Sequence, residues 1–147
     1  MPASEKPRTF QVDRQTWEQM RLDVARRAPE EACGLLAGER KGSQLQASRL
    51  FITANLLHSA TRYRIDPHEQ LAAFNQMEAE GLELVGIYHS HPHGPEEPSP
   101  TDLAEAYYPE AVYLIWSGRN GEWSCQAYSI QQALVTPVRI KILNTGA

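Results

Sequence analysis

Residues 82–90 read Leu-Glu-Leu-Val-Gly-Ile-Tyr-His-Ser, and this run predicts a central strand of the fold. Its nearly continuous hydrophobicity is typical of a strand that is covered on both faces. Because side chains alternate between the two faces of a strand, a period of two divides the residues into two sets. One set is Val85, Ile87, His89 and His91, and the other is Leu84, Gly86, Tyr88 and Ser90. We therefore expect both histidines to emerge together at the carboxyl end of the strand.

The segment before this strand predicts two long helices. The first runs from about residue 14 to residue 27 and ends before Pro29. Its apolar residues are spaced for one buried stripe, made of Trp17, Met20 or Arg21, Val24 and Ala25.

The second helix is predicted to begin after Asp66. Asp66 is the expected N-cap, Pro67 occupies the first helical position, and Glu69 is expected to close a capping box. Leu71, Phe74 and Met77 then form the apolar stripe, and Gly81 ends the helix.

The remaining elements complete a mixed α/β pattern. Further strands are expected at residues 31–37, 45–53, 111–116, 123–130 and 135–143. A stiff, proline-rich loop at residues 92–100 leads into a short helix from Pro100 to about Tyr107. The order predicts a mixed β-sheet flanked by two long helices, with a short helix at the candidate site. We expect one domain over residues 1–147, with a core at about 10–143 and flexible ends at 1–9 and 144–147.

The composition favours a globular domain that would bind a metal through nitrogen and oxygen. The chain has 147 residues, of which 41% are hydrophobic. A domain of about 150 residues buries roughly 70% of its unfolded surface, so it needs no disulfides. Two cysteines, Cys33 and Cys125, are too few for a disulfide framework or a four-cysteine zinc site. Because the sequence shows neither a signal peptide nor a membrane span, and two thiols suit a reducing compartment, we expect a cytoplasmic protein without a membrane partner.

The formal net charge of −4 hides an acidic block. Residues 65–110 contain 10 acidic residues and no Lys or Arg, whereas the rest of the chain is mildly basic. Such a block repels phosphate backbones, which argues against a nucleic-acid partner, and it favours cations or basic partners. The alternative interpretation of most of these carboxylates, solvated faces of helices, stays open.

The candidate chemistry lies in His89-Ser90-His91 and, seven residues later, in Ser99-Pro100-Thr101-Asp102. Two histidines two residues apart on a strand point the same way and can share one metal ion. Asp102, in the first turn of the next helix, supplies a third ligand. Three protein ligands leave one tetrahedral position open for water, which is the arrangement of a catalytic zinc site. Such an ion would lower the pKa of that water and polarise a carbonyl.

A general base that is not a metal ligand is still required. Glu31 is the candidate, because a carboxylate that enters an apolar strand needs a reason to be there. Strand alternation favours it over Glu30, which would face the opposite side. Ser99, at the positive end of a helix dipole, is the candidate for a hydrogen bond to the oxyanion of a tetrahedral intermediate.

Each of these residues also has a structural interpretation when taken alone. Ser99 and Asp102 match a helix capping box, and His89 matches a buried core histidine. Glu31 could be an edge carboxylate, but only a metal site accounts for all of them together. The other candidates are assigned elsewhere: His93 to the rim with no role, His58 and His68 to the surface, and Cys33 to a buried position near the site.

Together, these residues resemble the JAMM (MPN+) metallopeptidases, whose pattern is Glu-x-Cys/Met-Gly, then His-Ser/Thr-His, seven residues and Ser-x-x-Asp. Here the pattern reads Glu31-Ala32-Cys33-Gly34 and His89-Ser90-His91 through Ser99-Pro100-Thr101-Asp102, without departure. Arg62-Tyr63-Arg64-Ile65-Asp66-Pro67 and Gly86-Ile87-Tyr88 look like the compact prokaryotic branch. The resemblance spans about residues 10–143 and implies a layout similar to that of cytidine deaminases.

By this resemblance, His89, His91 and Asp102 are the ligands of one zinc ion per chain. Glu31 is then the base that activates the water and later protonates the leaving amine, and Ser99 stabilises the oxyanion. Family members hydrolyse peptide or isopeptide bonds after the C-terminal Gly-Gly of ubiquitin or a ubiquitin-like protein. Small prokaryotic relatives act on sulfur-carrier proteins and remove a C-terminal amino acid such as cysteine. The implied partner is such a carrier, and no second zinc site is expected.

Two other functions stay open at this point. One is a non-catalytic scaffold or binding domain of the same fold, although inactive relatives usually lack a ligand and none is lacking here. The other is a different zinc hydrolase or a nucleoside deaminase, although deaminases need His-x-Glu and Pro-Cys-x-x-Cys, which this sequence lacks. The carrier, the choice between peptide and isopeptide bonds, and the oligomeric state are left open by the sequence.

Overall fold

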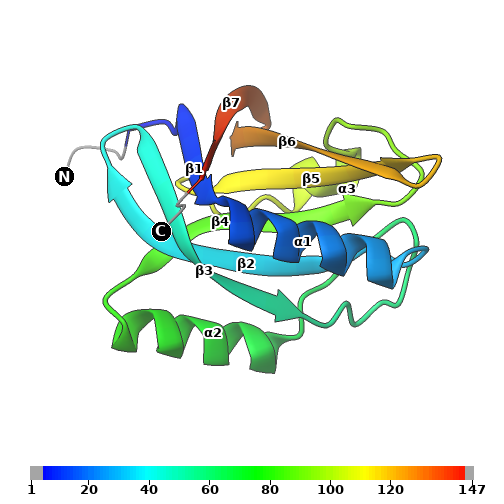
Figure 1. The fold of residues 1–147 in the computed structure, drawn as a ribbon, viewed down its shortest axis with the longest axis horizontal. Coiled ribbons are helices and arrows are strands. Elements are labelled where there is room, and N and C mark those ends of the chain that lie inside the picture. Colours follow the sequence, from blue (N-terminus) through cyan, green and yellow to red (C-terminus); the bar gives the residue numbers. More distant parts are fainter. Residues whose placement is uncertain (1–4, 145–147) are drawn as a thin grey trace.

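Seven strands close into a barrel in the computed structural model, which describes residues 5–144 (Figure 1). Around the barrel they follow the order β1, β3, β2, β4, β5, β6, β7. The elements are β1 (Thr9–Asp13), α1 (Arg14–Arg27), β2 (Cys33–Lys41), β3 (Gln44–Thr53), α2 (Pro67–Ala79), β4 (Glu83–His91), α3 (Pro100–Ala104), β5 (Val112–Arg119), β6 (Glu122–Gln131) and β7 (Leu134–Leu143).

The mixed α/β class is confirmed. The predicted open sheet flanked by two helices is wrong, because the sheet closes on itself into a barrel. Strand β1, which the sequence patterning did not predict, pairs in parallel with both β3 and β7 and so joins the two ends of the sheet. Its alternation buries Phe10 and Val12 completely. A period of two is a weak signal over five residues, which is why the strand was missed.

Hydrophobic side chains pack on both surfaces of the strands. One cluster surrounds α1, and the other lies between the strands and the helices α2 and α3. In Figure 1, α1 crosses in front of the strands and α2 lies below β3. The predicted bounds of α1 are confirmed, and Met20 and Val24 are buried as expected, whereas Ala25 is exposed. Trp17 stacks on Trp116 of β5, with ring centroids 4.6 Å apart.

Strand β4 lies at the centre of the sheet, as predicted, and is buried from Val85 to His91. It pairs antiparallel with β2, where Cys33 faces His89, and parallel with β5, where Ile115 faces His89. A bulge interrupts the β2–β4 register, because Leu36 and Ala37 face Gly86 and Leu84 and leave Val85 between them.

Because of the bulge, the first residues of β4 lie on the opposite sides of the sheet from those predicted. Val85 packs in the cluster around α1 together with Tyr88, while Leu84 packs with Ile87 in the cluster under α2. The prediction was therefore wrong for these first residues of the strand. Beyond Gly86 the alternation is regular.

Helix α2 begins at the predicted N-cap, but its capping box is not formed. The Asp66 carboxylate accepts a hydrogen bond from His68 N–H at 2.8 Å, whereas Glu69 accepts one from Ala54 N–H in the preceding loop at 2.7 Å. The buried stripe also differs from the prediction: Ala73 and Met77 are buried, and Leu71 is 61% exposed. Gly81, with a φ of +70°, adopts the left-handed conformation that ends the helix.

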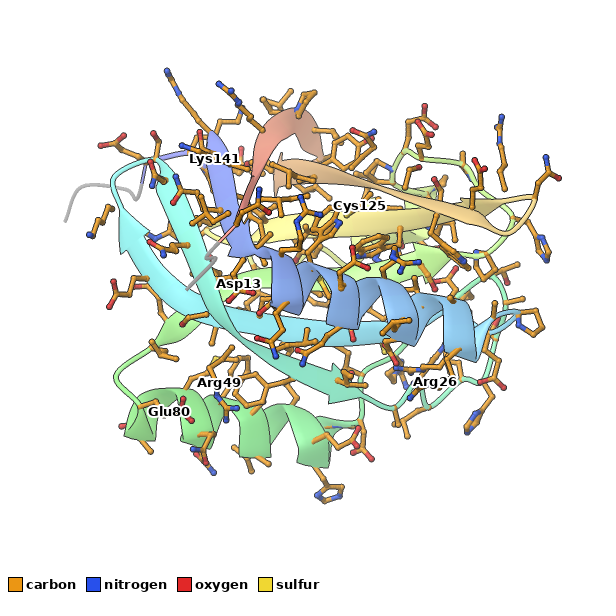
Figure 2. All side chains as sticks on the ribbon, viewed as in Figure 1. Asp13, Arg26, Arg49, Glu80, Cys125 and Lys141 are labelled. Carbon is orange, nitrogen blue, oxygen red and sulfur yellow. The ribbon has the colours of Figure 1, made fainter. Side chains whose placement is uncertain are left out.

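Arginines from the first half of the chain pair with the acidic block. Figure 2 shows Arg49 on β3 close to Glu80 at the end of α2, and their side chains are 2.9 Å apart. These ion pairs support the interpretation of the block as solvated faces whose charge is partly balanced within the chain. The pairs are Arg40–Glu83 at 3.3 Å, Arg49–Glu80 at 2.9 Å and Arg62–Glu105 at 3.9 Å.

The expected flexible ends include residues 1–4 and 145–147, which lie outside the described residues. Within the described chain, β1 begins at Thr9, close to the expected start of the core at about residue 10. Among the helices of residues 5–144, none is long and apolar enough to cross a membrane.

A buried polar network beneath β4 provides a test of the fold. The Tyr88 hydroxyl donates a hydrogen bond to Asp23 of α1 at 2.8 Å, and Asp23 also pairs with Arg27 at 3.1 Å. Because the Tyr88→Phe change leaves a buried carboxylate with one donor fewer, we expect it to lower the free energy of unfolding by about 1–3 kcal/mol. Urea titration of both proteins measures the difference. Tyr107→Phe, at a tyrosine that is 73% exposed, serves as the control and should change stability little; equal effects would contradict the assignment.

Candidate metal centre

Three side-chain donor atoms converge where β4 ends and α3 begins. His89 Nε2 lies 3.2 Å from His91 Nε2, and each of these atoms lies 3.1 Å from Asp102 Oδ2. Both histidines are buried, with exposed fractions of 1% and 6%. The structure therefore brings together the three residues that the sequence proposed as ligands.

The start of α3 fixes the position of Asp102. The Ser99 hydroxyl oxygen accepts a hydrogen bond from Asp102 N–H at 3.0 Å, and Asp102 Oδ2 accepts one from Ser99 N–H at 2.8 Å. These two bonds form the predicted capping box. The Asp102 oxygen that completes the capping box is thus also the oxygen that faces the imidazoles. Burial opposes ionisation of Asp102, but the hydrogen bonds from His89 and His91 hold the pKa of this carboxyl well below its usual range.

A backbone carbonyl holds the imidazole of His91. Its Nδ1 lies 2.7 Å from the carbonyl oxygen of Pro95, which can only accept a hydrogen bond. Nδ1 therefore carries a proton in either charge state of the ring, and a metal ion bound at Nε2 would replace the proton that this atom otherwise shares with Asp102. Burial lowers the pKa of His91, but the hydrogen bonds to Asp102 and Pro95 outweigh burial and raise it overall.

The imidazole of His89 has a different environment. Its Nδ1 is buried and has no hydrogen-bond partner among the described residues. One face of the ring stacks on Tyr63, with centroids 4.5 Å apart and planes inclined at 21°. Burial lowers the pKa of His89, and Asp102 offsets this only in part, so the neutral ring that a metal requires is favoured.

Glu31 lies beside the three donors, 2% exposed, in the segment that precedes β2. The prediction that it belongs to the strand is wrong, because β2 begins at Cys33. Burial is the main reason that its pKa is raised to about 8; His91 opposes the shift and Asp102 adds to it. Oε1 of Glu31 has no hydrogen-bond partner among the described residues. Glu30 does not reach the centre and instead lies 3.5 Å from His58.

Two side chains that the sequence did not single out hold the Glu31 segment. Ser90 lies on the opposite face of β4 from the histidines, and its hydroxyl oxygen accepts a hydrogen bond from Ala32 N–H at 2.7 Å. Asn55, 3% exposed, donates to the carbonyl oxygen of Glu31 at 3.0 Å. Ser90 could have been found from its place between the two histidines, whereas no local pattern marks Asn55.

Asn55 uses all of its hydrogen-bonding capacity. Its amide nitrogen donates to the carbonyl oxygens of Glu31 and Arg62, each at 3.0 Å. Its oxygen accepts from Leu57 N–H at 3.1 Å and Arg64 N–H at 3.0 Å. One side chain thus joins the segment of Glu31 to the loop that carries Tyr63.

The remaining sequence candidates lie where they were expected. His93, His58 and His68 are exposed, and Cys33 is fully buried opposite His89 on the neighbouring strand. A cavity of about 260 Å³ adjoins the centre, with Tyr63 in its wall and Leu35, Ile87 and Tyr113 among its lining residues.

The donor geometry fits a tetrahedral zinc ion. With metal–ligand bonds of about 2.0–2.1 Å, donor atoms around such an ion lie about 3.3 Å apart. The distances among His89, His91 and Asp102 are 3.1–3.2 Å. A second possible set is Glu31 with the two histidines, whose donor atoms lie within 4.8 Å of one another. Two imidazoles and one carboxylate are also the donor types of a catalytic zinc site with an open position.

Comparison with known proteins identifies the family of the chain. The chain matches the model for prokaryotic homologues of the JAB domain over residues 13–130, a range that contains all four residues of the centre. It is similar to a probable TtuB-protein conjugate cleaving protease of Thermus thermophilus, with 43% identity over 111 residues, 75% of this chain and 70% of that protein. It is also similar to the CysO-cysteine peptidase of Mycobacterium tuberculosis, with 36% identity over 116 residues, 78% of each chain. The solution structure of a protein from Desulfitobacterium hafniense has a TM-score of 0.83 and 32% identity, and covers 92% of this chain and 93% of that chain.

Two substitutions separate the two possible ligand sets. Asp102→Asn keeps an oxygen for the helix cap but removes the anionic donor, so we expect zinc affinity to fall more than about 10-fold. Glu31→Gln should leave the affinity within about threefold of that of the unmutated chain, because Glu31 is not expected to be a ligand. Competition with a chromophoric chelator measures both affinities. The reverse order would identify Glu31 as the third ligand.

Proposed function

The chain belongs to the family of prokaryotic homologues of the JAB domain, and from this premise we propose that it is a zinc-dependent metallopeptidase. The proposed reaction is hydrolysis of a peptide or isopeptide bond after the C-terminal Gly-Gly of a ubiquitin-like or sulfur-carrier protein. The observation that carries the proposal is the convergence of His89, His91 and Asp102 donor atoms within 3.2 Å, beside the buried carboxylate of Glu31.

His89, His91 and Asp102 are the residues that would hold the zinc ion. When bound, zinc would lower the pKa of a water molecule and polarise the carbonyl of the scissile bond. The protein side of this arrangement is preformed, because a strand end and a helix cap place the three donors. No flexible loop has to close to bring them together.

Glu31 is the proposed general base and general acid. A pKa of about 8 lies near neutral pH, where the carboxyl group can take a proton from the attacking water and later give one to the leaving amine. The backbone bonds from Asn55 and to Ser90 restrict the segment, while Oε1 is left without a competing partner among the described residues. These features support proton transfer rather than a purely structural role.

Ser99 is the proposed oxyanion donor. Its oxygen accepts the hydrogen bond of the helix cap, which leaves the hydroxyl proton available to donate. The side chain is half-buried and accepts a hydrogen bond from the Asp102 N–H at 3.0 Å, which places it beside the donor atoms. A hydroxyl in this place can stabilise negative charge that develops on the carbonyl oxygen of the substrate.

The activities named for two relatives support the substrate class. One names a conjugate of TtuB with a protein, and the other names a CysO-cysteine bond. The leaving group is a protein in the first case and a single amino acid in the second. What the two substrates share is the carrier protein, and the proposal is therefore limited to the carrier. The Gly-Gly terminus is carried over from the family pattern, whose residues are all present here. We place the reaction in the cytoplasm, which the free thiols Cys33 and Cys125 support.

The proposed activity can be tested on a β-grasp carrier that ends in Gly-Gly and is extended by one cysteine or joined to a lysine side chain. We expect the zinc-loaded chain to release the extension and a chelator to stop the reaction. Removing the general base by Glu31→Gln should lower the rate by about 10²–10⁴-fold. Mass spectrometry of the carrier measures cleavage.

His93→Gln is the matched control, because His93 belongs to the same histidine cluster in the sequence but is exposed. It should keep the rate of the unmutated chain. Cleavage that survives both the chelator and Glu31→Gln would rule out hydrolysis at this centre.

Ser99 gives a separate prediction about the oxyanion. Ser99→Ala should lower kcat by about 10²–10³-fold with little change in KM, because the lost donor acts in the transition state. It should also cost about 1 kcal/mol of stability through the lost helix cap. Ser99→Thr keeps both the cap and the hydroxyl donor and should retain kcat. A Ser99→Ala protein that loses stability but keeps kcat would leave Ser99 with the capping role alone.

A further inference from the structure

The two histidines of the centre are oriented by different means. The Nδ1 of His91 is fixed by the Pro95 carbonyl at 2.7 Å. His89 has no equivalent, since its Nδ1 is buried without a partner among residues 5–144. Metal-binding histidines usually donate their second nitrogen to a carboxylate, a carbonyl or water, which fixes the orientation of the ring. The contacts that orient the His89 ring are therefore those of its Nε2 atom with Asp102, its edge contact with His91 and the packing on its face.

Burial restricts the His89 ring, which is 1% exposed, but it does not by itself select one of the two ring orientations. The torsion that turns the ring is broad and roughly two-fold, so a half turn exchanges the positions of the two ring nitrogens. Only one orientation of His89 places Nε2 3.1 Å from Asp102. The strand pairing with Cys33 and Ile115 fixes the backbone of His89 but not the plane of its ring.

Tyr63 is the residue in position to fix that plane. Its ring stacks on the imidazole at a centroid distance of 4.5 Å and an inclination of 21°. Tyr63 also borders the cavity of about 260 Å³, so a shorter side chain would leave space rather than another support. Its neighbours in the chain are anchored, because Asn55 bonds both the Arg62 carbonyl and the Arg64 N–H.

We propose that Tyr63 is a positioning residue that holds the imidazole of His89 in its ligating orientation by stacking, in place of the usual hydrogen bond. This inference rests on the proposed zinc function. It adds to that function a residue that is neither a proposed ligand nor the proposed base or oxyanion donor. The flat ring, and not the hydroxyl, carries the effect. Tyr63 does not touch the reacting atoms and is therefore not a catalytic residue.

Substitutions of Tyr63 in the full chain test the proposal through zinc affinity, measured by competition with a chromophoric chelator. Tyr63→Phe keeps the flat ring and should bind zinc within about twofold of the unmutated chain. Tyr63→Leu and Tyr63→Met keep apolar bulk without a ring and should weaken binding by about 10-fold or more, as the loss of an outer-shell partner does. The absorption spectrum of the cobalt-substituted protein should change in the Leu and Met variants and not in the Phe variant.

Tyr107→Leu is the matched control, since Tyr107 lines the same cavity but is 73% exposed, whereas the ring stacked on His89 is that of Tyr63. It should bind zinc as the unmutated chain does. Thermal unfolding of the metal-free variants shows whether each one is folded; if one of the Leu and Met variants is not, the other carries the comparison. The proposal is overturned if the Tyr63→Leu or Tyr63→Met variant binds zinc as tightly as the unmutated chain. It is also overturned if the Tyr63→Phe variant loses as much affinity as those two variants. Failure of the unmutated chain to bind zinc would overturn the proposed function as well, whereas tight binding retained by the Leu variant would overturn only the role of Tyr63.

Discussion

The candidate centre depends on the interactions of one atom, Oδ2 of Asp102. It accepts the hydrogen bond from Ser99 N–H at 2.8 Å and lies 3.1 Å from the Nε2 atoms of His89 and His91. A surface aspartate would keep several rotamers, but this one is held by the first turn of a helix. The capping box is therefore compatible with the proposed role of Asp102 as a ligand, because the same oxygen completes the cap and faces the histidines.

Two carboxylates with opposite pKa shifts lie at this centre, Glu31 fully buried and Asp102 partly buried. Hydrogen bonds from the histidines keep Asp102 ionised, whereas burial without a partner for Oε1 raises the pKa of Glu31 to about 8. Such a separation divides the roles of ligand and proton carrier between two groups of the same chemical type. Asn55 keeps this difference in place, because it bonds the backbone of Glu31 and the loop of Tyr63 without bonding either functional group.

The sequence could predict that His89, His91 and Asp102 come together because the patterns that place them are local. Strand alternation places His89 and His91 on one side, and a capping pattern places Asp102 at the start of the next helix, so both rules act over a few residues. The parts that it missed depend on partners far along the chain. The bulge at Val85 exists only in the pairing of β4 with β2, and β1 is recognisable as a strand only beside β3 and β7. Glu69 matched the pattern of a capping box, but its carboxylate instead accepts a hydrogen bond from Ala54 N–H, 15 residues away in the chain.

The acidic block shows why net charge was a poor guide to the centre and burial a good one. Glu80, Glu83 and Glu105 are paired with arginines from outside the block, on faces where solvent and salt screen their charge. Asp102 is the member of the block that faces the histidines, and Glu31 lies outside the block altogether. The two carboxylates that matter act because they are removed from water, where a charge or a proton is held more strongly than at the surface. A fold that buries β4 on both sides therefore provides the surroundings for the proposed chemistry, and the block contributes one proposed ligand, Asp102.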